Sequence, residues 1–138
     1  MPNHCQNRID IHCDTVEQAK EIKDFLHSEE TCFDLTKILP EPDYDKVEVL
    51  PTFPDIRGNN EPVKKDHAWW DWRVQNWGTK WNSYDCEVIE MDDDQVEYTF
   101  NTAWSPPEGV IEKLREQYPD IQITAFYDEP GMEIAGYY

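Results

Sequence analysis

The chain has 138 residues and a formal net charge of −18, with 38% hydrophobic and 13% aromatic residues. This length suits one domain with a packed core, and the aromatic content is too high for a disordered chain. The charge excludes free DNA or RNA as an expected partner, because phosphate binding needs a basic surface, and no run of about 18 apolar residues is present to cross a membrane.

The first elements along the chain are a strand, a helix and a short extended segment. Residues 7–12 alternate apolar and polar side chains, which is typical of a strand. Asp14 or Thr15 can cap a following helix that runs to about residue 27. The apolar stripe expected on this helix comprises Val16, Ala19, Ile22, Phe25 and Leu26. Residues 32–39 indicate an extended segment that covers the core.

A proline-rich loop and a tryptophan-rich helix follow. Five prolines break regular structure between residues 40 and 65, and residues 58–60 indicate a turn. We expect Asp66 to cap a helix over residues 67–77, which contains four of the six tryptophans. Gly78 is expected to end this helix, because glycine adopts the left-handed conformation there without strain.

The rest of the chain predicts a hairpin, a helix and two more strands. The expected elements are strands at 85–91 and 95–101, a helix at 107–118, and strands at 121–128 and 131–137. Three aspartates, Asp92, Asp93 and Asp94, form the tip of the hairpin. Ser105 is expected to cap the helix, and Glu108 three residues later completes a capping box.

The order of these elements predicts an α+β fold in a single domain that spans residues 1–138. Without an insert at about 40–82, the order is βαββαβ, the ferredoxin-like (split βαβ) arrangement. We expect an antiparallel sheet with the two long helices on one face. The insert then adds the proline-rich loop and the tryptophan-rich helix.

Four sequence blocks carry a resemblance to a known family. They are residues 2–7 with the strand at 9–11, residues 76–81, residues 102–107, and residues 129–132 with Ala135 and Gly136. Together they resemble the YubB-type ferredoxin-like domain family. The resemblance implies the ferredoxin-like fold and an accessory protein carried by a phage, plasmid or other mobile element. It implies no particular activity.

The cysteine pattern predicts reduced thiols. Cys5, Cys13, Cys32 and Cys86 form no Cys-x-x-Cys pair, and the N-terminal residues show no basic segment followed by an apolar one. Without a secretory signal, cysteines are expected to stay reduced in the cytoplasm. We therefore expect a cytoplasmic protein.

No metal or other cofactor is expected. His4, Cys5, His12 and Cys13 are soft ligands of the kind that zinc takes. On one strand, however, the two cysteines point to one face and the two histidines to the other. The hairpin aspartates also do not have the spacing of an EF-hand calcium loop.

The tryptophan-rich helix has two apolar faces, and one sheet cannot easily cover both. Trp70, Val74 and Trp77 form one face, and Trp69, Trp72 and Asn76 form the other. The second face either lies under the proline-rich loop or binds a ligand or partner. Arg73 and Lys80 are placed to stack on the rings. Candidate residues for a pocket or interface are Trp69, Trp72, Asn76, Trp77, Thr79, Trp81 and Trp104.

The acidic residues suggest a second candidate surface. Residues 81–138 carry 14 acidic and 2 basic side chains. Glu108, Glu112 and Glu116 share one helix face, which is either a solvated face or an anionic stripe that imitates a phosphate backbone. Together with Asp92, Asp93 and Asp94 they are the candidate binding face for a basic partner.

The sequence contains no Gly-x-Ser-x-Gly, Walker or paired-histidine motif, so catalytic residues are not predicted. The first hypothesis is a non-enzymatic acidic interaction protein that blocks a basic host protein, such as a nucleic-acid-directed defence factor. The alternative is a small-ligand-binding module or minor enzyme with a tryptophan-lined pocket.

Overall fold

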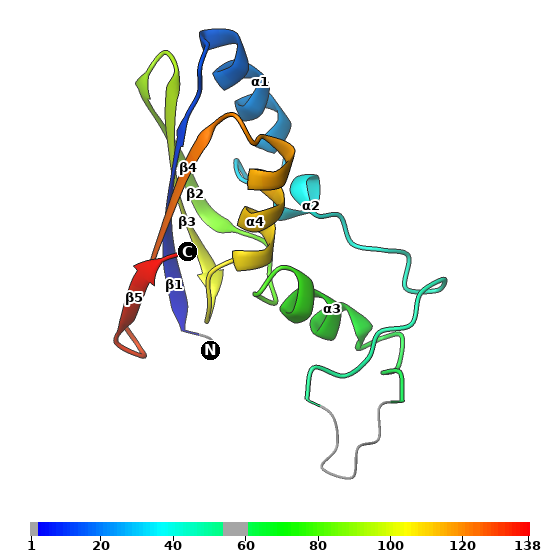
Figure 1. The fold of residues 1–138 in the computed structure, drawn as a ribbon. Helices are drawn as coiled ribbons and strands as arrows, with labels where there is room; N and C mark the ends of the chain where they lie inside the picture. Colours follow the sequence, from blue (N-terminus) through cyan, green and yellow to red (C-terminus); the bar gives the residue numbers. More distant parts are fainter. Residues whose placement is uncertain (1–2, 54–60) are drawn as a thin grey trace.

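A five-stranded antiparallel sheet forms the centre of the computed structural model, which describes residues 3–53 and 61–138 (Figure 1). The strands are β1 (His4–His12), β2 (Tyr84–Asp92), β3 (Gln95–Ala103), β4 (Gln122–Glu129) and β5 (Ile134–Tyr137). They lie in the order β2-β3-β1-β4-β5, and every adjacent pair is antiparallel. The predicted antiparallel sheet is confirmed; the turn predicted at residues 58–60 lies outside the described residues.

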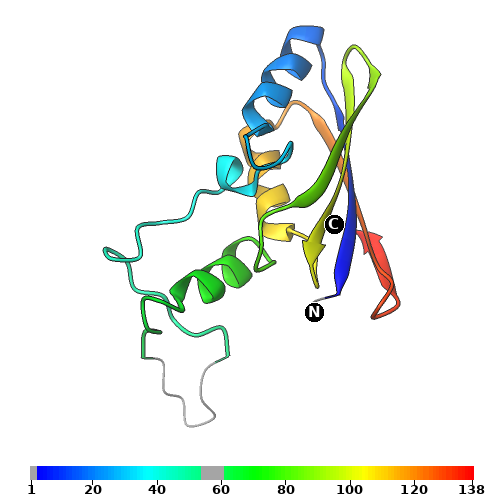
Figure 2. The ribbon, with the colours of Figure 1, turned by 180° about the vertical axis from the view of Figure 1, so that it is seen from behind.

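The helices are α1 (Val16–Leu26), α2 (Leu35–Ile38), α3 (Ala68–Asn76) and α4 (Glu108–Gln117). Both views show α1 and α4 on the same face of the sheet, as predicted (Figures 1 and 2). The other face has no helix of the described residues against it. The α3 helix lies beyond the end of this layer, next to the start of α4.

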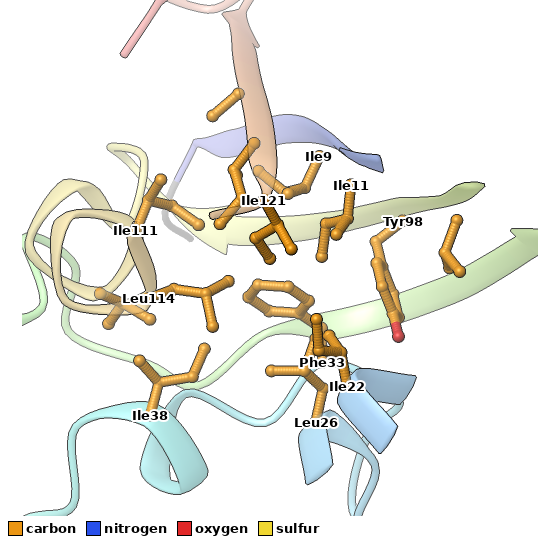
Figure 3. Close-up of a cluster of buried hydrophobic side chains, with 14 of the residues drawn as sticks. Ile9, Ile11, Ile22, Leu26, Phe33, Ile38, Tyr98, Ile111, Leu114 and Ile121 are labelled. Atoms are coloured by element: carbon orange, nitrogen blue, oxygen red, sulfur yellow. The ribbon is translucent and has the colours of Figure 1, made fainter. Parts of the chain in front are cut away.

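Alternating strand residues and the inner sides of α1 and α4 form one apolar core. Ile9 and Ile11 of β1 are fully buried, as are Ile111 and Leu114 of α4. Phe33, which follows α1, lies in the middle of this cluster (Figure 3). Its ring stacks on Phe100 at 4.7 Å and meets Tyr98 edge-on at 5.2 Å. The alternation of apolar and polar residues along the strands therefore correctly predicted which strand side chains face the core.

Two details of the first helical region differ from the prediction. Val16 is 52% exposed, so the core stripe of α1 begins at Ala19. Residues 35–38 form the helical turn α2, where an extended segment was expected. The reason is local, because Asp34 Oδ1 accepts hydrogen bonds from the Thr36 amide at 2.9 Å and the Thr36 hydroxyl at 2.6 Å. Those bonds form an N-terminal cap that begins a helix.

The two predicted caps of the later helices are wrong, although both helices are present. The α3 helix begins at Ala68 with His67 at its N-cap position and no side-chain cap, so Asp66 does not serve there. Pro107 occupies the N-cap position of α4, and the Ser105 hydroxyl donates to the Gly78 carbonyl instead. Gly78 has a φ of +92°, which confirms the predicted left-handed end of α3.

The prediction that all the cysteines are reduced is wrong. Cys32 and Cys86 form a disulfide, with their Cα atoms 5.9 Å apart. The bond joins the segment after α1 to the edge strand β2, across a sequence separation of 54 residues. The closed segment contains α2, the proline-rich loop and α3. Cys5 and Cys13 are free and buried, while His4 and His12 are exposed, as the strand alternation predicted.

Candidate ligand-binding site

The sequence blocks that carry the family resemblance meet at one end of the sheet. Asn3 accepts a hydrogen bond at its carbonyl from the Trp104 amide, at 2.9 Å. The Asn7 amide group donates to the Thr102 hydroxyl at 2.9 Å. A Cβ on Gly131 would lie 2.8 Å from the Asn3 side chain, so the turn after β4 closes tightly on the start of β1. The first, third and fourth blocks are therefore in direct contact.

The second block joins α3 to the same end. The Thr79 hydroxyl is buried and donates to the Ala103 carbonyl at 2.9 Å. The Gly109 amide donates to the Trp77 carbonyl at 3.2 Å. A Cβ on Gly109 would lie only 1.8 Å from the Asn76 carbonyl oxygen, so α3 and α4 approach closely because this residue is glycine. This contact fixes α3 against the domain.

A pocket of about 530 Å³ lies where the closed segment returns to the sheet. Its wall consists of His4, Glu30, Thr36, Arg73, Trp81, Asn82, Ser83 and Tyr84. All of these residues except His4 and Glu30 belong to the segment that the disulfide closes. The pocket therefore forms between the start of β1, the end of the α1 region and the segment between α2 and β2.

One wall of the pocket is aromatic. The rings of Trp81 and Tyr84 meet edge to face with centroids 6.4 Å apart, and those of Tyr84 and His4 do so at 5.6 Å. The His4 Nδ1 atom and the Tyr84 hydroxyl also form a hydrogen bond. Burial raises the pKa of Tyr84, and the nearby Asp85 carboxylate raises it further, so the phenol stays neutral. Trp81 remains 38% exposed.

The polar wall is held in place from behind. The Asn82 Oδ1 atom accepts from the amides of Leu35 and Ser83, both at 2.9 Å, and its Nδ2 atom donates to Asp34 at 2.9 Å. Burial opposes ionisation of Asp34, but hydrogen bonds from Thr36, Ser28 and Asn82 outweigh it and lower its pKa. An ionised Asp34 therefore anchors both α2 and the Asn82 turn.

Arg73 fastens the proline-rich loop to α3. Its Nε atom lies 2.9 Å from Glu41 Oε1, and one of its terminal nitrogens donates to the Lys80 carbonyl at 3.1 Å. The guanidinium lies 4.9 Å from the ring centre of Trp77 and 5.3 Å from that of Trp69. The predicted stacking of Arg73 on the tryptophans is confirmed. Lys80 Nζ likewise lies 5.0 Å from the centre of the Trp81 ring.

The structure distributes the predicted tryptophan residues over three environments. Trp77 is fully buried and donates from Nε1 to the Leu39 carbonyl at 2.8 Å. Trp72 packs edge-on against Trp77, at 6.0 Å. Trp104 is 43% exposed and lies with Trp70 on a separate hollow of about 230 Å³. Of the predicted tryptophans, Trp81 is the one on the wall of the larger pocket.

The remaining predicted pocket residues make contacts within α3 or between its C-terminal end and the sheet. Trp69 is half-buried under Arg73, and the exposed Asn76 donates from its amide to the Trp72 carbonyl at 2.9 Å. Thr79 donates a hydrogen bond to the Ala103 carbonyl of β3. Sequence reasoning missed six of the pocket residues, which are His4, Glu30, Thr36, Asn82, Ser83 and Tyr84. Only Tyr84 carried a signal, as an aromatic residue three positions after Trp81.

The candidate acidic residues lie in two places. Glu108, Glu112 and Glu116 are exposed on α4, and Lys113 Nζ approaches Glu116 at 3.8 Å. The hairpin aspartates Asp92, Asp93 and Asp94 are also exposed, but Asp92 and Asp93 line a hollow against α1 together with Lys20 and Lys23. The two lysines of α1 offset part of the charge at the hairpin.

This strand order, with two helices on one face, defines a ferredoxin-like α+β domain. Residues 76–138 match the family model described as "Ferredoxin-like domain in Api92-like protein". The crystal structure of a protein api92 from Yersinia pseudotuberculosis is similar, with a TM-score of 0.65 and 9% sequence identity over 99% of this chain and 93% of that chain. That identity shows a shared fold alone. No curated protein matches the chain.

None of the helices within residues 3–53 and 61–138 is long and apolar enough to cross a membrane. In the same residues, no three His, Cys, Asp or Glu side chains are grouped so that they could hold a metal ion. The YubB-type name and the mobile-element origin stay predictions.

Proposed function

We propose that this protein is a non-enzymatic binding module that takes a small ligand in the pocket beside Trp81. The observation that carries the proposal is the pocket itself, whose volume of about 530 Å³ lies within the range of small-molecule sites. The lining combines the aromatic rings of Trp81 and Tyr84 with polar side chains, which can fix the orientation of a ligand. Trp81 gives the ligand an exposed ring to pack on.

The frame of the pocket supports binding because it is ordered before a ligand arrives. Asn82 and Asp34 tie the polar wall to α2, and the Cys32–Cys86 disulfide ties the same segment to β2. A wall that is already fixed loses little conformational entropy when a ligand binds. The aromatic and polar groups therefore contribute to affinity without a large ordering cost.

The hydrogen bonds of the wall favour binding over catalysis. The Ser83 hydroxyl lies 2.8 Å from the Thr31 hydroxyl and also donates to the Phe33 carbonyl. The His4 Nδ1 atom is bonded to Tyr84. A serine nucleophile needs a base within hydrogen-bond reach, and these two side chains are each bonded to other partners.

A thermal-shift screen tests the proposal. The wild-type protein and two variants, Trp81→Leu and Trp104→Leu, are screened against one set of amines, amino acids, nucleosides and sugars. Trp104→Leu is the matched control, because Trp104 is similarly exposed, at 43% against 38%, but lines a different hollow. We expect a compound that raises the melting temperature of wild type and Trp104→Leu but not of Trp81→Leu. No shift with any compound would contradict the proposal.

A second candidate function rests on the α4 stripe. Glu108, Glu112 and Glu116 are all exposed and lie on one side of the helix. Such a stripe attracts a basic protein surface, including one that ordinarily binds nucleic acid. Under this proposal the protein is a phage- or plasmid-borne inhibitor of a basic host defence protein. Its binding would weaken steeply with salt.

Charge substitutions distinguish partner binding by the α4 glutamates from partner binding by the hairpin aspartates. A triple variant with Glu108→Gln, Glu112→Gln and Glu116→Gln should lose capture of a basic partner at low salt. The control is a triple variant with Asp92→Asn, Asp93→Asn and Asp94→Asn, which removes the same charge next to the lysines of α1. Equal capture by wild type and the glutamine variant would contradict the α4 proposal. The predicted cytoplasmic location rested in part on reduced cysteines, and the Cys32–Cys86 disulfide removes that support.

A further inference from the structure

The chemistry of the Trp81 pocket points to the class of its ligand. We infer that the pocket binds a small organic cation, such as a quaternary or methylated ammonium group. This inference rests on the proposed function, because it names the ligand of the same site. It is carried by the arrangement of the rings of the wall, by a lysine ammonium that lies over the Trp81 ring, and by the balance of charge around the pocket.

The rings form a corner rather than a flat surface. Trp81 and Tyr84 are inclined by 68° to each other, and so are Tyr84 and His4. A cation in such a corner contacts the face of one ring while it stays close to the next. The negative face of an indole or phenol attracts an ammonium group, and the attraction is strongest for tryptophan. Corners of aromatic rings are how proteins hold methylated ammonium groups.

The structure already places a cation over the Trp81 ring. Lys80 Nζ lies 5.0 Å from the centre of the Trp81 ring, within the distance of a cation–π contact. The Trp81 ring is therefore in a position where an ammonium group is stabilised. Lys80 itself lines the hollow that contains Trp104, so a ligand cation would use the part of the Trp81 ring that faces the pocket.

The charges around the pocket favour a cation over an anion. Arg73 lies on the wall, but its Nε and terminal nitrogens are occupied by Glu41 and the Lys80 carbonyl. The arginine is thus neutralised by its own partner. Glu30 is an exposed carboxylate of the pocket lining, and the net charge of −18 attracts cations and repels anions. An anionic ligand would have to compete with Glu41 for the guanidinium.

The test compares a cation with its neutral isostere. Choline and 3,3-dimethylbutan-1-ol have nearly the same shape but differ by the positive charge, and acetate serves as the anionic probe. Binding to the full chain is measured by titration calorimetry and by two-dimensional NMR. We expect choline to bind about tenfold or more tightly than the neutral alcohol, because desolvated cation–π contacts have this magnitude. Acetate should produce no specific change.

Variants connect the affinity to the wall. Trp81→Leu should weaken choline binding about tenfold, Trp81→Phe should weaken it less, and Trp104→Leu should leave it unchanged. Glu30→Gln should also weaken it, with a dependence on salt. Melting temperatures establish that each variant is folded. Because Trp81 lies outside the buried core, its replacement is expected to keep the fold.

The possible results distinguish a failure of the cation specificity from a failure of the proposed small-ligand site. Equal affinity for choline and the neutral alcohol, or unchanged choline binding by folded Trp81→Leu, would overturn the cation inference and leave a pocket for another ligand. Absence of choline binding would overturn it as well. Only a failure of the whole compound screen would overturn the proposed function itself.

Discussion

The disulfide between Cys32 and Cys86 closes the segment that carries α2, α3 and most of the pocket wall. Both cysteines are half-buried next to the core, and Cys86 lies on the edge strand β2. The bond thus ties the tryptophan-rich part of the chain to the sheet at the point where that part leaves and returns. Because most of the pocket wall lies within the closed segment, we expect the pocket to be sensitive to reduction of this bond.

Removal of this disulfide should destabilise the protein. By the chain-entropy relation, closing a loop with a sequence separation of 54 residues contributes about 4 kcal/mol to the free energy of unfolding. We expect the Cys32→Ser, Cys86→Ser double variant to lose about this much in urea unfolding. A reducing agent should lower the stability of wild type but not of the variant. Equal stability of wild type with and without reductant would contradict the bond.

Substitution of Gly109 tests the contact between α3 and α4. A Cβ at this position would lie 1.8 Å from the Asn76 carbonyl oxygen. Gly109→Ala should therefore destabilise the protein by about 1–3 kcal/mol, as overpacking does in a closely packed interior. Gly136→Ala is the control, because its nearest neighbour would be Tyr127 Cε1 at an ordinary 3.7 Å. Chemical unfolding of the two variants measures the difference, and equal stabilities would contradict the close approach.

The Arg73–Glu41 pair should hold the proline-rich loop. Both side chains are about three-quarters or more buried, at 24% and 21% relative exposure. Arg73→Met keeps the apolar stem but leaves the Glu41 carboxylate without its partner, which should cost about 2 kcal/mol. A double-mutant cycle with Glu41→Gln measures the coupling between the two residues. A coupling energy near zero would show that the pair does not hold the loop.

The Cys5 thiol gives a pH dependence with a defined sign. Burial raises its pKa from 9.0 to about 11, opposed by a hydrogen bond from Thr102. Between these values the unfolded chain loses the thiol proton while the folded chain keeps it, so the free energy of unfolding falls as pH rises from 9 to 11. Cys5→Ala should show a smaller decrease. Iodoacetamide should label Cys5 at pH 8 only after unfolding.

Local patterns in the sequence predicted the sheet, whereas the site depends on contacts between distant residues. Val96, Tyr98 and Phe100 alternate and are buried as expected, because a central strand must bury one face. The predicted cap at Ser105 was wrong because its hydroxyl finds the Gly78 carbonyl, 27 residues away. No local rule brings His4 to Tyr84, 80 residues apart; the sheet does so because β1 and β2 both pair with β3, on opposite sides of it.

The disulfide and the exposed tryptophans also depend on contacts between distant residues, which local sequence patterns do not predict. A pair of cysteines without a shared motif is joined only when folding brings their Cα atoms within reach, here 5.9 Å. The composition of the tryptophan-rich segment predicted a candidate site, but the choice of Trp81 over Trp77 required the position of Leu39, which covers and hydrogen-bonds Trp77. Burial of one ring and exposure of another is a tertiary property.

The most direct measurement is the two-dimensional ¹H–¹⁵N spectrum of the tryptophan indoles during a titration with choline. The signals are assigned with the leucine variants of Trp81 and Trp104. The Trp81 pocket predicts a saturable shift of the Trp81 indole signal, with the signals of the buried Trp77 and the remote Trp104 unchanged. Equal shifts of all the indole signals, or a saturable shift confined to Trp104, would contradict a ligand site beside Trp81.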